Sequence, residues 1–561
     1  MLGNDYASLG PWLLSIIELG LMLASSMLIW RSQGRSGSGS FRSLGAAFHH
    51  FARRRTLAAV SVALGVIVMR TALIPVLGVP QPRWNDEFSY LLAGDTFAHG
   101  RLTNPTHPMW IHFETFHVIQ HPTYMSMYPP AQGLVLAAGQ VLGHPWIGQL
   151  LITAATCWAI CWMLQAWVPP TSALLGAVLA ALRVGILSYW MNTYWCASIA
   201  AFGGALVLGA WPRLRKRMHP GHGLVLALGL VLLANSRPYE GMIFGIPVAI
   251  AMLLWLFAKH HPEWNQVLPT LSVILVVLAA GAFATAYYYE RVTGSPVRMT
   301  YQVNRAQYTA APYFIWEKLR PEPEYHHAIM RDYYRLETAQ FQRNETVRGY
   351  LERGAGKFVD WWRFYLGPLL TLPLLPLPWI IRQRKMRLPV AICAAMIAGF
   401  AVQTWTLPHY FSPATGALYI LLTQGLRHLH TRGTVGRQTV RAIPILACFM
   451  IVIRVAGAAT HTPIEAAWPR GNLERAAVLR ELRAMPGQQL VLVRYGPNHD
   501  LHREWVWNRA SIDSAKVIWA RDMGDANNQE LLKYFKTRRA WQLDADDPSP
   551  KLKPYAAAPA P

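Results

Sequence analysis

Apolar blocks separated by short polar segments fill the chain from near its start to residue 457. About twelve of these blocks approach the roughly 20 residues that a helix needs to cross a bilayer. They cover residues 11–30, 57–79, 146–167, 171–189, 197–211, 223–235, 241–258, 267–287, 366–381, 388–406, 409–426 and 442–457. The pattern predicts an all-α polytopic membrane protein with about twelve transmembrane helices.

The periodicity changes after residue 457. The expected elements are a helix at 472–485, strands at 489–495 and 516–520, a helix at 528–536 and a strand at 540–543. Strands that alternate with helices are typical of a parallel sheet. We therefore expect a membrane module over 1–457, a small α/β domain over 458–553 and a disordered Pro- and Ala-rich tail over 554–561.

The charge distribution predicts the orientation of these parts. The chain carries a formal net charge of +23, but its basic residues concentrate in alternate short loops at 31–55, 213–217, 382–387 and 427–441. By the positive-inside rule those loops are cytoplasmic. The outer loops at 80–145 and 288–365, and all residues after 457, then face outward, as do both termini.

The same composition excludes a nucleic-acid partner and points to a bacterial membrane. No basic stretch is interleaved with aromatic residues in the way that would track a nucleic acid strand. Arginine greatly outnumbers lysine, and Ala, Gly and Pro are plentiful, which is typical of a GC-rich bacterial genome. We expect a multi-pass protein of the bacterial cytoplasmic (inner) membrane, with lipids as its surroundings. The five cysteines, all in or beside apolar blocks, are expected to be packing residues.

Two adjacent carboxylates, Asp86 and Glu87, follow the second apolar block in the sequence Arg-Trp-Asn-Asp-Glu-Phe-Ser-Tyr. One interpretation is a helix start, with Asn85 or Asp86 as the cap. The other is chemical, because ionised side chains are costly near hydrocarbon and mark functional sites there. A short amphipathic helix over 86–100, lying near the membrane surface, is expected to follow.

A carboxylate in this place could act as a general base toward an acceptor hydroxyl, with a phosphate as the leaving group. Cations that could bind the phosphate are Arg237, Arg298 and His409. For Arg237 the structural alternatives are a salt bridge with Glu240 or a side chain that snorkels to the membrane interface. For His409 the alternative is a structural role at that interface.

Three further polar residues lie in or beside apolar blocks. Arg183 would require a partner or a lipid phosphate, and Glu18 is one candidate for the partner. Asn192 lies in an aromatic segment that suits an interfacial belt, and its amide could hydrogen-bond a sugar.

The acidic motif resembles that of a known superfamily. Asp86-Glu87-x-x-Tyr90, then Ala93, Gly100 and the later Tyr128-Pro129-Pro130, are similar to the first outer loop of GT-C glycosyltransferases. The most similar group contains the bacterial aminoarabinose transferases and protein O-mannosyltransferases.

The resemblance implies transfer of a hexosyl or pentosyl group, with inversion at the anomeric carbon, from a polyprenyl-phosphate sugar to a hydroxyl of a glycan, lipid or protein. It assigns Asp86 and Glu87 as catalytic residues, with Asp86 the better candidate for the base, and Tyr90 to the helix that follows. Some members use a divalent cation, so Mg or Mn at Asp86 and Glu87 is one option, although no oxygen-rich cage is evident.

One departure from the group affects phosphate recognition. The aminoarabinose branch has a basic residue before the Pro-containing motif, whereas this chain has Met127-Tyr128. Phosphate recognition would then rest on Arg183, Arg237 and Arg298, with Tyr90, Tyr128, Asn192, Glu240 and His409 completing the substrate site. Two other classes stay open: a transporter or flippase of lipid-linked sugars, and a non-catalytic membrane assembly protein. Transporters often contain internal repeats, and none is evident here.

The orientation can be checked by labelling in intact cells. A single cysteine replacing Ser38, in a variant without the native cysteines, should be shielded from an impermeant thiol reagent, because residues 31–55 are predicted to be cytoplasmic. One replacing Ser549 should react. The opposite labelling would contradict the outward placement of both large loops.

Overall fold

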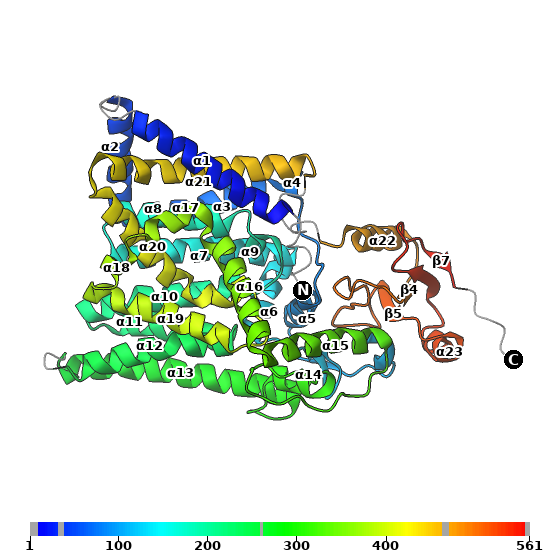
Figure 1. The fold of residues 1–561 in the computed structure, drawn as a ribbon. Helices are drawn as coiled ribbons and strands as arrows, with labels where there is room; N and C mark the ends of the chain where they lie inside the picture. The colour runs from blue at the N-terminus through cyan, green and yellow to red at the C-terminus, as the bar shows by residue number, and fades with distance from the viewer. Residues whose placement is uncertain (1–8, 32–38, 259–261, 463–470, 556–561) are drawn as a thin grey trace.

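The computed structural model describes residues 9–31, 39–258, 262–462 and 471–555, and its main body is a bundle of long apolar helices. Seven helices in these ranges are long and apolar enough to cross a membrane. They are α1 (Leu9–Arg31), α3 (Arg55–Ala72), α7 (Pro145–Trp167), α10 (Ala197–Lys216), α12 (Pro238–Leu256), α13 (Trp264–Thr293) and α21 (Gly433–Ala459). Two shorter apolar helices, α8 (Pro170–Ala180) and α11 (Pro220–Ala234), lie among them (Figure 1). The chain is a multi-pass membrane protein.

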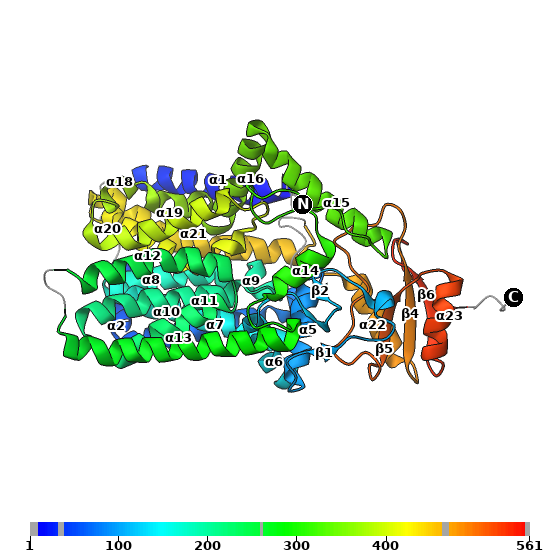
Figure 2. The same ribbon diagram turned by 90° about the horizontal axis from the view of Figure 1, so that it is seen from below.

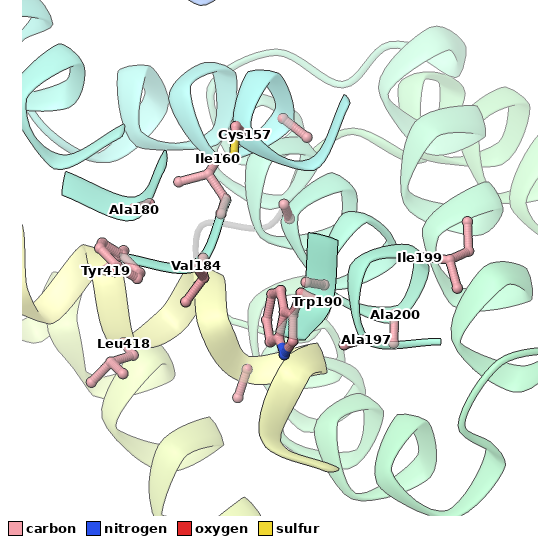
Figure 3. Close-up of a cluster of buried hydrophobic side chains, with 14 of the residues drawn as sticks. Cys157, Ile160, Ala180, Val184, Trp190, Ala197, Ile199, Ala200, Leu418 and Tyr419 are labelled. Carbon is pink, nitrogen blue, oxygen red and sulfur yellow. The ribbon is translucent and has the colours of Figure 1, made fainter. Parts of the chain in front are cut away.

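Small residues allow the helices of the bundle to approach closely. A Cβ added to Gly229 of α11 would lie 2.7 Å from the carbonyl oxygen of Gly203 in α10. One added to Gly209 would enter the ring of Trp162 in α7. Figure 3 shows the resulting core, in which Cys157 and Trp190 pack among aliphatic side chains. All five cysteines are free, and three are buried, as expected of packing residues.

The last predicted spans are interrupted by turns and short 3-10 segments, whereas their hydropathy predicted continuous helices. Residues 366–381 form only α17 (Gly367–Thr371), a turn of 3-10 helix (Leu372–Leu374) and α18 (Leu377–Ile380). Four prolines lie in this stretch, and each lacks the N–H that would continue a helix. Beyond it come α19 (Arg387–Ala401), the 3-10 helix η7 (Pro408–Ala414) and α20 (Thr415–His430). Three remaining short helices are α2 (Gly39–Arg53), α4 (Ile74–Leu77) and α9 (Tyr189–Asn192).

The first outer loop folds as two packed helices and a small sheet. Helix α5 (Asn85–Ala98) begins at the acidic pair, and α6 (Pro130–Val141) begins at the predicted Pro-Pro step. A Cβ added to Gly133 of α6 would lie 2.7 Å from the Cβ of Ala93 in α5, so the helices are nearly in backbone contact. Between them lie η2 (Trp110–Phe113) and the antiparallel strands β1 (Asn104–Pro105), β2 (Val118–Ile119) and β3 (Thr123–Ser126), in the order β1-β3-β2.

Helix α5 differs from the amphipathic surface helix that the sequence predicts. Its polar residues Ser89, Asp95 and Thr96 are as buried as Phe88 and Leu92. The C-terminal residues cover the side that was expected to face water: Ala510 N donates to Asp95 Oδ2 (2.8 Å), and Phe88 packs on Trp507. The helix is therefore enclosed between the bundle and the C-terminal part of the chain.

The second outer loop contributes three helices. These are α14 (Thr300–Tyr308), α15 (Ala328–Gln342) and, after a 3-10 turn at Arg343–Glu345, α16 (Val347–Tyr365). Figure 1 shows α16 crossing the direction of the spanning helices near the end of the bundle that faces α15.

The C-terminal residues form the predicted α/β unit. Its elements are α22 (Leu473–Ala484), β4 (Gln489–Arg494), β5 (Val517–Arg521), α23 (Asp525–Tyr534), β6 (Arg539–Asp544) and β7 (Lys553–Pro554). The strand order is β5-β4-β6-β7, with the first three strands parallel and β7 antiparallel. Pro554, expected to open the tail, belongs to β7, and residues 556–561 lie outside the described residues.

This unit sits against the first outer loop at one end of the bundle (Figure 2). One hydrophobic cluster contains Leu92 and Phe113 of the loop together with Leu490 and Ile518 of the sheet. Tyr124 OH also donates to the carbonyl oxygen of Asn508 (3.0 Å). The contacts hold α5, and with it the acidic pair, from the side opposite the bundle.

Candidate active site

Asp86 lies in the first turn of α5, and its carboxylate meets two side chains of the first outer loop. Tyr128 OH donates to Asp86 Oδ1 at 2.6 Å. His117 Nδ1 contacts the same oxygen and forms an ion pair when the imidazole is protonated. Within the described residues, every hydrogen bond of this carboxylate uses Oδ1. The other oxygen belongs to a side chain that is 25% exposed, and it accepts no hydrogen bond from the described residues.

His117 was not singled out from the sequence, and the structure places it beside Asp86. Its φ of 59° lies in the left-handed region, which a residue with a side chain rarely adopts and which marks functional sites. Its carbonyl oxygen accepts bonds from Ser89 Oγ (2.6 Å) and Met127 N (3.1 Å). Its Nε2 lies 3.2 Å from Tyr333 OH of α15. Histidine is frequent in this loop, and this was the only signal in the sequence.

Glu87 faces the opposite way from Asp86. It is 1% exposed, and its Oε2 accepts bonds from the backbone N–H groups of Arg83 (2.9 Å) and Trp84 (3.1 Å). Its Oε1 accepts from Tyr194 N at 3.1 Å. Glu87, rather than Asn85 or Asp86, therefore satisfies the start of α5, and the helix-start interpretation holds for one member of the pair.

The two neighbours also differ in proton affinity. Burial opposes ionisation of Asp86, but the charge of His117 and the hydrogen bonds from His117 and Tyr128 outweigh it, lowering its pKa to about 2. For Glu87 burial dominates the three backbone donors and raises the pKa to about 7. Asp86 is therefore ionised at neutral pH, as a proton acceptor must be.

A cluster of polar side chains around Arg237 lies near this carboxylate. Arg237 Nη2 forms an ion pair with Glu240 Oε1 (3.1 Å), which also accepts a bond from Gln403 Nε2 (3.3 Å). The guanidinium stacks on Tyr410 at 3.6 Å from the ring centroid. Its Nε is buried and has no hydrogen-bond partner in the described parts of the chain. The salt bridge weighed as the structural alternative is present, yet one donor of Arg237 remains unused.

His409 connects the cluster to Asp86. Its ring packs against Trp195, with the centroids 4.7 Å apart, and it interacts electrostatically with both Asp86 and Arg237. Its Nδ1 is buried, again with no protein partner among the residues described. The Arg237 Nε and His409 Nδ1 atoms are therefore both open to a hydrogen bond with a ligand.

Two tyrosines named from the sequence line the site. Tyr90 stacks on Tyr128, with their centroids 4.2 Å apart, and donates to Cys196 Sγ (3.1 Å). Tyr301 of α14 packs edge-on against Tyr128. The site thus draws on the first outer loop, the bundle and the second outer loop.

Three other candidates have different surroundings. Arg183 pairs with Glu18 (3.6 Å), as the sequence suggested, and donates to the carbonyl oxygens of Arg363 and Phe364. Asn192 accepts a bond from Arg70 Nε (2.8 Å) and donates to the carbonyl oxygens of Ile186 and Ser188. Arg298 is exposed between α13 and α14. The first two have structural partners, and no hydrogen bond or ion pair joins Arg298 to Asp86 within the described ranges.

The site shows limited capacity for a metal ion. The described residues contain no group of three or more His, Cys, Asp or Glu side chains that could hold one. Asp86 and His117 are the two that meet, while both oxygens of Glu87 accept from backbone donors. A cation held jointly by Asp86 and Glu87 does not fit this arrangement.

Comparison with known proteins identifies the fold. No family model and no curated protein matches the sequence. Among solved structures, ArnT from Cupriavidus metallidurans bound to undecaprenyl phosphate is 13% identical, with 87% of this chain and 92% of that chain covered and a TM-score of 0.50. Its apo state gives 0.49. The Archaeoglobus fulgidus oligosaccharyltransferase tethered with an acceptor peptide is 12% identical, with 86% and 68% covered and a TM-score of 0.47.

The likeness to ArnT confirms the fold that the acidic motif predicted. The chain shares the fold of ArnT over most of its length. At 13% identity the comparison establishes the fold alone, so the chemistry must be argued from the site.

The opposite environments of the acidic pair predict a pH effect on stability. A pKa raised from 4.5 to about 7 means that the stabilising contribution of Glu87 is complete below about pH 4.5 and is lost as pH rises through about 7. The difference corresponds to about 3 kcal/mol. The melting temperature of the detergent-solubilised protein should therefore fall between about pH 5 and about pH 8.

The variant Glu87→Gln should lower the melting temperature at about pH 5, because an amide satisfies the three N–H groups poorly. Above about pH 5 the melting temperature of this variant should change less with pH than that of the wild type, because the titrating group is gone. The exposed Glu322→Gln is the matched control. An unchanged slope in Glu87→Gln would show that another group causes the effect.

Proposed function

We propose that the chain is an integral membrane glycosyltransferase. It moves a sugar from a polyprenyl-phosphate donor to an acceptor hydroxyl at the extracytoplasmic face of the bacterial inner membrane. The observation that carries the proposal is an ionised Asp86 with one free oxygen, set beside buried, unpartnered nitrogens of Arg237 and His409. ArnT, which shares the fold, binds undecaprenyl phosphate in one of its crystal structures, and this supports a lipid-phosphate donor.

The side chains suit a single displacement. Asp86 Oδ2 accepts the proton of the acceptor hydroxyl as the acceptor oxygen attacks the anomeric carbon. The bond from that carbon to the donor phosphate oxygen breaks, giving an inverted glycoside and polyprenyl phosphate. Asp86 later releases the proton to water. Charge develops on the leaving phosphate, where Arg237 Nε can donate, as can His409 Nδ1 in the neutral tautomer that carries its hydrogen on this nitrogen.

His117 and Tyr128 position the base. Both contact Oδ1, so the carboxylate is held ionised with Oδ2 directed away from them. Tyr333 contacts the far side of the His117 ring, which fixes the imidazole between α5 and α15. Pre-ordering of this kind lowers the cost of reaching the reactive geometry.

The rival classes draw less support from the geometry. Transport was suggested by the charges of Glu18 and Arg183, but these pair with each other and with backbone carbonyls. A non-catalytic assembly protein would not require the unpartnered polar atoms around Asp86. Radiolabelled prenyl-phosphate sugar separates the three: label reaches an acceptor in a transferase, crosses vesicles unchanged in a transporter, and does neither for an assembly protein.

The variant Asp86→Asn tests the base. Asparagine retains the shape and can accept the bond from Tyr128, but it cannot take a proton. Turnover should fall by about a hundred-fold or more, with donor affinity near that of the wild type. The exposed Asp332→Asn on α15 should retain turnover. Near-normal sugar transfer by Asp86→Asn would show that Asp86 is not the general base.

The variant Arg237→Gln tests phosphate recognition. Losing a charged hydrogen bond costs about 1.5–3 kcal/mol, so donor affinity should fall by about ten-fold to over a hundred-fold. Arg298→Gln, which removes an exposed arginine of the same outer region, should change it little. Because Glu240 would be left unpaired, the double variant Arg237→Gln, Glu240→Gln guards against misfolding. Equal losses at Arg237 and Arg298 would contradict the assignment.

A further inference from the structure

A second cationic site lies at the turn between α15 and α16. A cavity of about 420 Å³ is lined by Arg343, Thr346, Arg348, Gly349, Glu352 and Arg353. Three arginines and one glutamate make this lining strongly positive, and Glu352 already accepts a bond from Arg348 (2.7 Å). We name these six residues the arginine pocket.

Glu352 pairs with Arg348 inside the arginine pocket, and among the residues lining the pocket Arg343 and Arg353 have no acidic partner. Arg343 is exposed, and its charge acts on Arg353. Arg353 donates through Nη2 to the carbonyl oxygen of Thr404 (2.8 Å), while its Nε is buried with no partner in the described structure. Like charges gathered around one cavity are unfavourable unless an anion lies between them.

The pocket adjoins an uncovered apolar face. Val347, Leu351 and Phe358 are 78%, 62% and 53% exposed, and their spacing places them on one face of α16. Arg353 and Lys357 lie on a flank of this face, and both donate to carbonyl oxygens at or just after the end of α19. A helix that crosses the spans and combines an apolar face with cationic flanks is suited to the membrane interface.

We propose that the arginine pocket binds the phosphate of an anionic membrane lipid whose acyl chains lie along the apolar face of α16. The phosphate would bridge Arg343, Arg348 and Arg353, whose planar guanidinium groups match its oxygens. The exposed side chains at 347, 351 and 358 would then contact hydrocarbon. This site shares no residue with the Asp86 and Arg237 cluster, and the inference does not depend on the proposed activity.

The test is a binding titration on the purified full-length protein in detergent. The probes are dioctanoyl phosphatidic acid, inorganic phosphate and the zwitterionic dioctanoyl phosphatidylcholine. Wild type should bind the phosphatidic acid most tightly. The variant Arg343→Gln, Arg348→Gln should weaken that binding by about ten-fold or more, since charged hydrogen bonds are lost. Both arginines are exposed, so the fold should persist. Arg335→Gln, an exposed arginine of α15, is the matched control.

The remaining variants separate the sources of the anion. Val347→Ser, Leu351→Ser should also weaken phosphatidic acid binding, but not phosphate binding, if acyl chains lie on α16. Equal affinity for inorganic phosphate and the lipid would overturn the lipid assignment. If the double variant Arg343→Gln, Arg348→Gln bound phosphatidic acid as tightly as the wild type, the arginine pocket would not be the binding site. Loss of affinity confined to Arg237→Gln would place the lipid at the Asp86 cluster and also overturn the proposal.

Discussion

The Glu87 carboxylate joins two parts of the chain that are 107 positions apart in sequence. Its oxygens accept from the first residues of α5 and from Tyr194, which follows the membrane segment around Trp190. A buried carboxylate is costly unless donors surround it, so the start of α5 can occupy this place only with all three bonds formed. The direction of Asp86, one residue earlier, follows from this constraint. With the Glu87 carboxylate held in this way, the Asp86 carboxylate is turned toward His117 and Tyr128.

A second buried network ties the C-terminal unit to both outer loops. Arg521 of β5 pairs with Glu504 (2.9 Å) and donates to the carbonyl oxygen of Glu114 (2.6 Å). Burial alone would raise the pKa of Glu504, but the charge of Arg521 outweighs it and lowers that pKa. The Glu114 carboxylate accepts in turn from Tyr308 OH of α14 (2.8 Å). Breaking a buried pair typically leaves an uncompensated charge, so these contacts hold the C-terminal unit in a defined position over α5.

Arginine serves three distinct purposes in this chain. Arg183 pairs with Glu18, and Arg70 donates to Asn192 and to the carbonyl oxygen of Gly78, so both stabilise polar groups inside the bundle. Arg237 keeps one buried donor unused beside the candidate base. Arg343 and its neighbours surround a cavity at the end of α15. The residue type is the same in all three, and its surroundings decide whether it stabilises the fold or can bind a ligand.

The sequence by itself determined the membrane class, the starts of α5 and α6 and the parallel strands of the C-terminal unit, because hydrophobic periodicity and proline positions act locally. It also named Asp86, Arg237 and His409 as candidate site residues. It did not separate them from Arg183 and Asn192, which have the same polar character in similar apolar surroundings.

Only the tertiary structure decided which polar groups meet. It brought His117 to Asp86, turned Glu87 toward backbone donors and covered α5 with the C-terminal residues. These outcomes depend on contacts between segments far apart in the chain, and a local pattern of polar and apolar positions carries no record of such contacts.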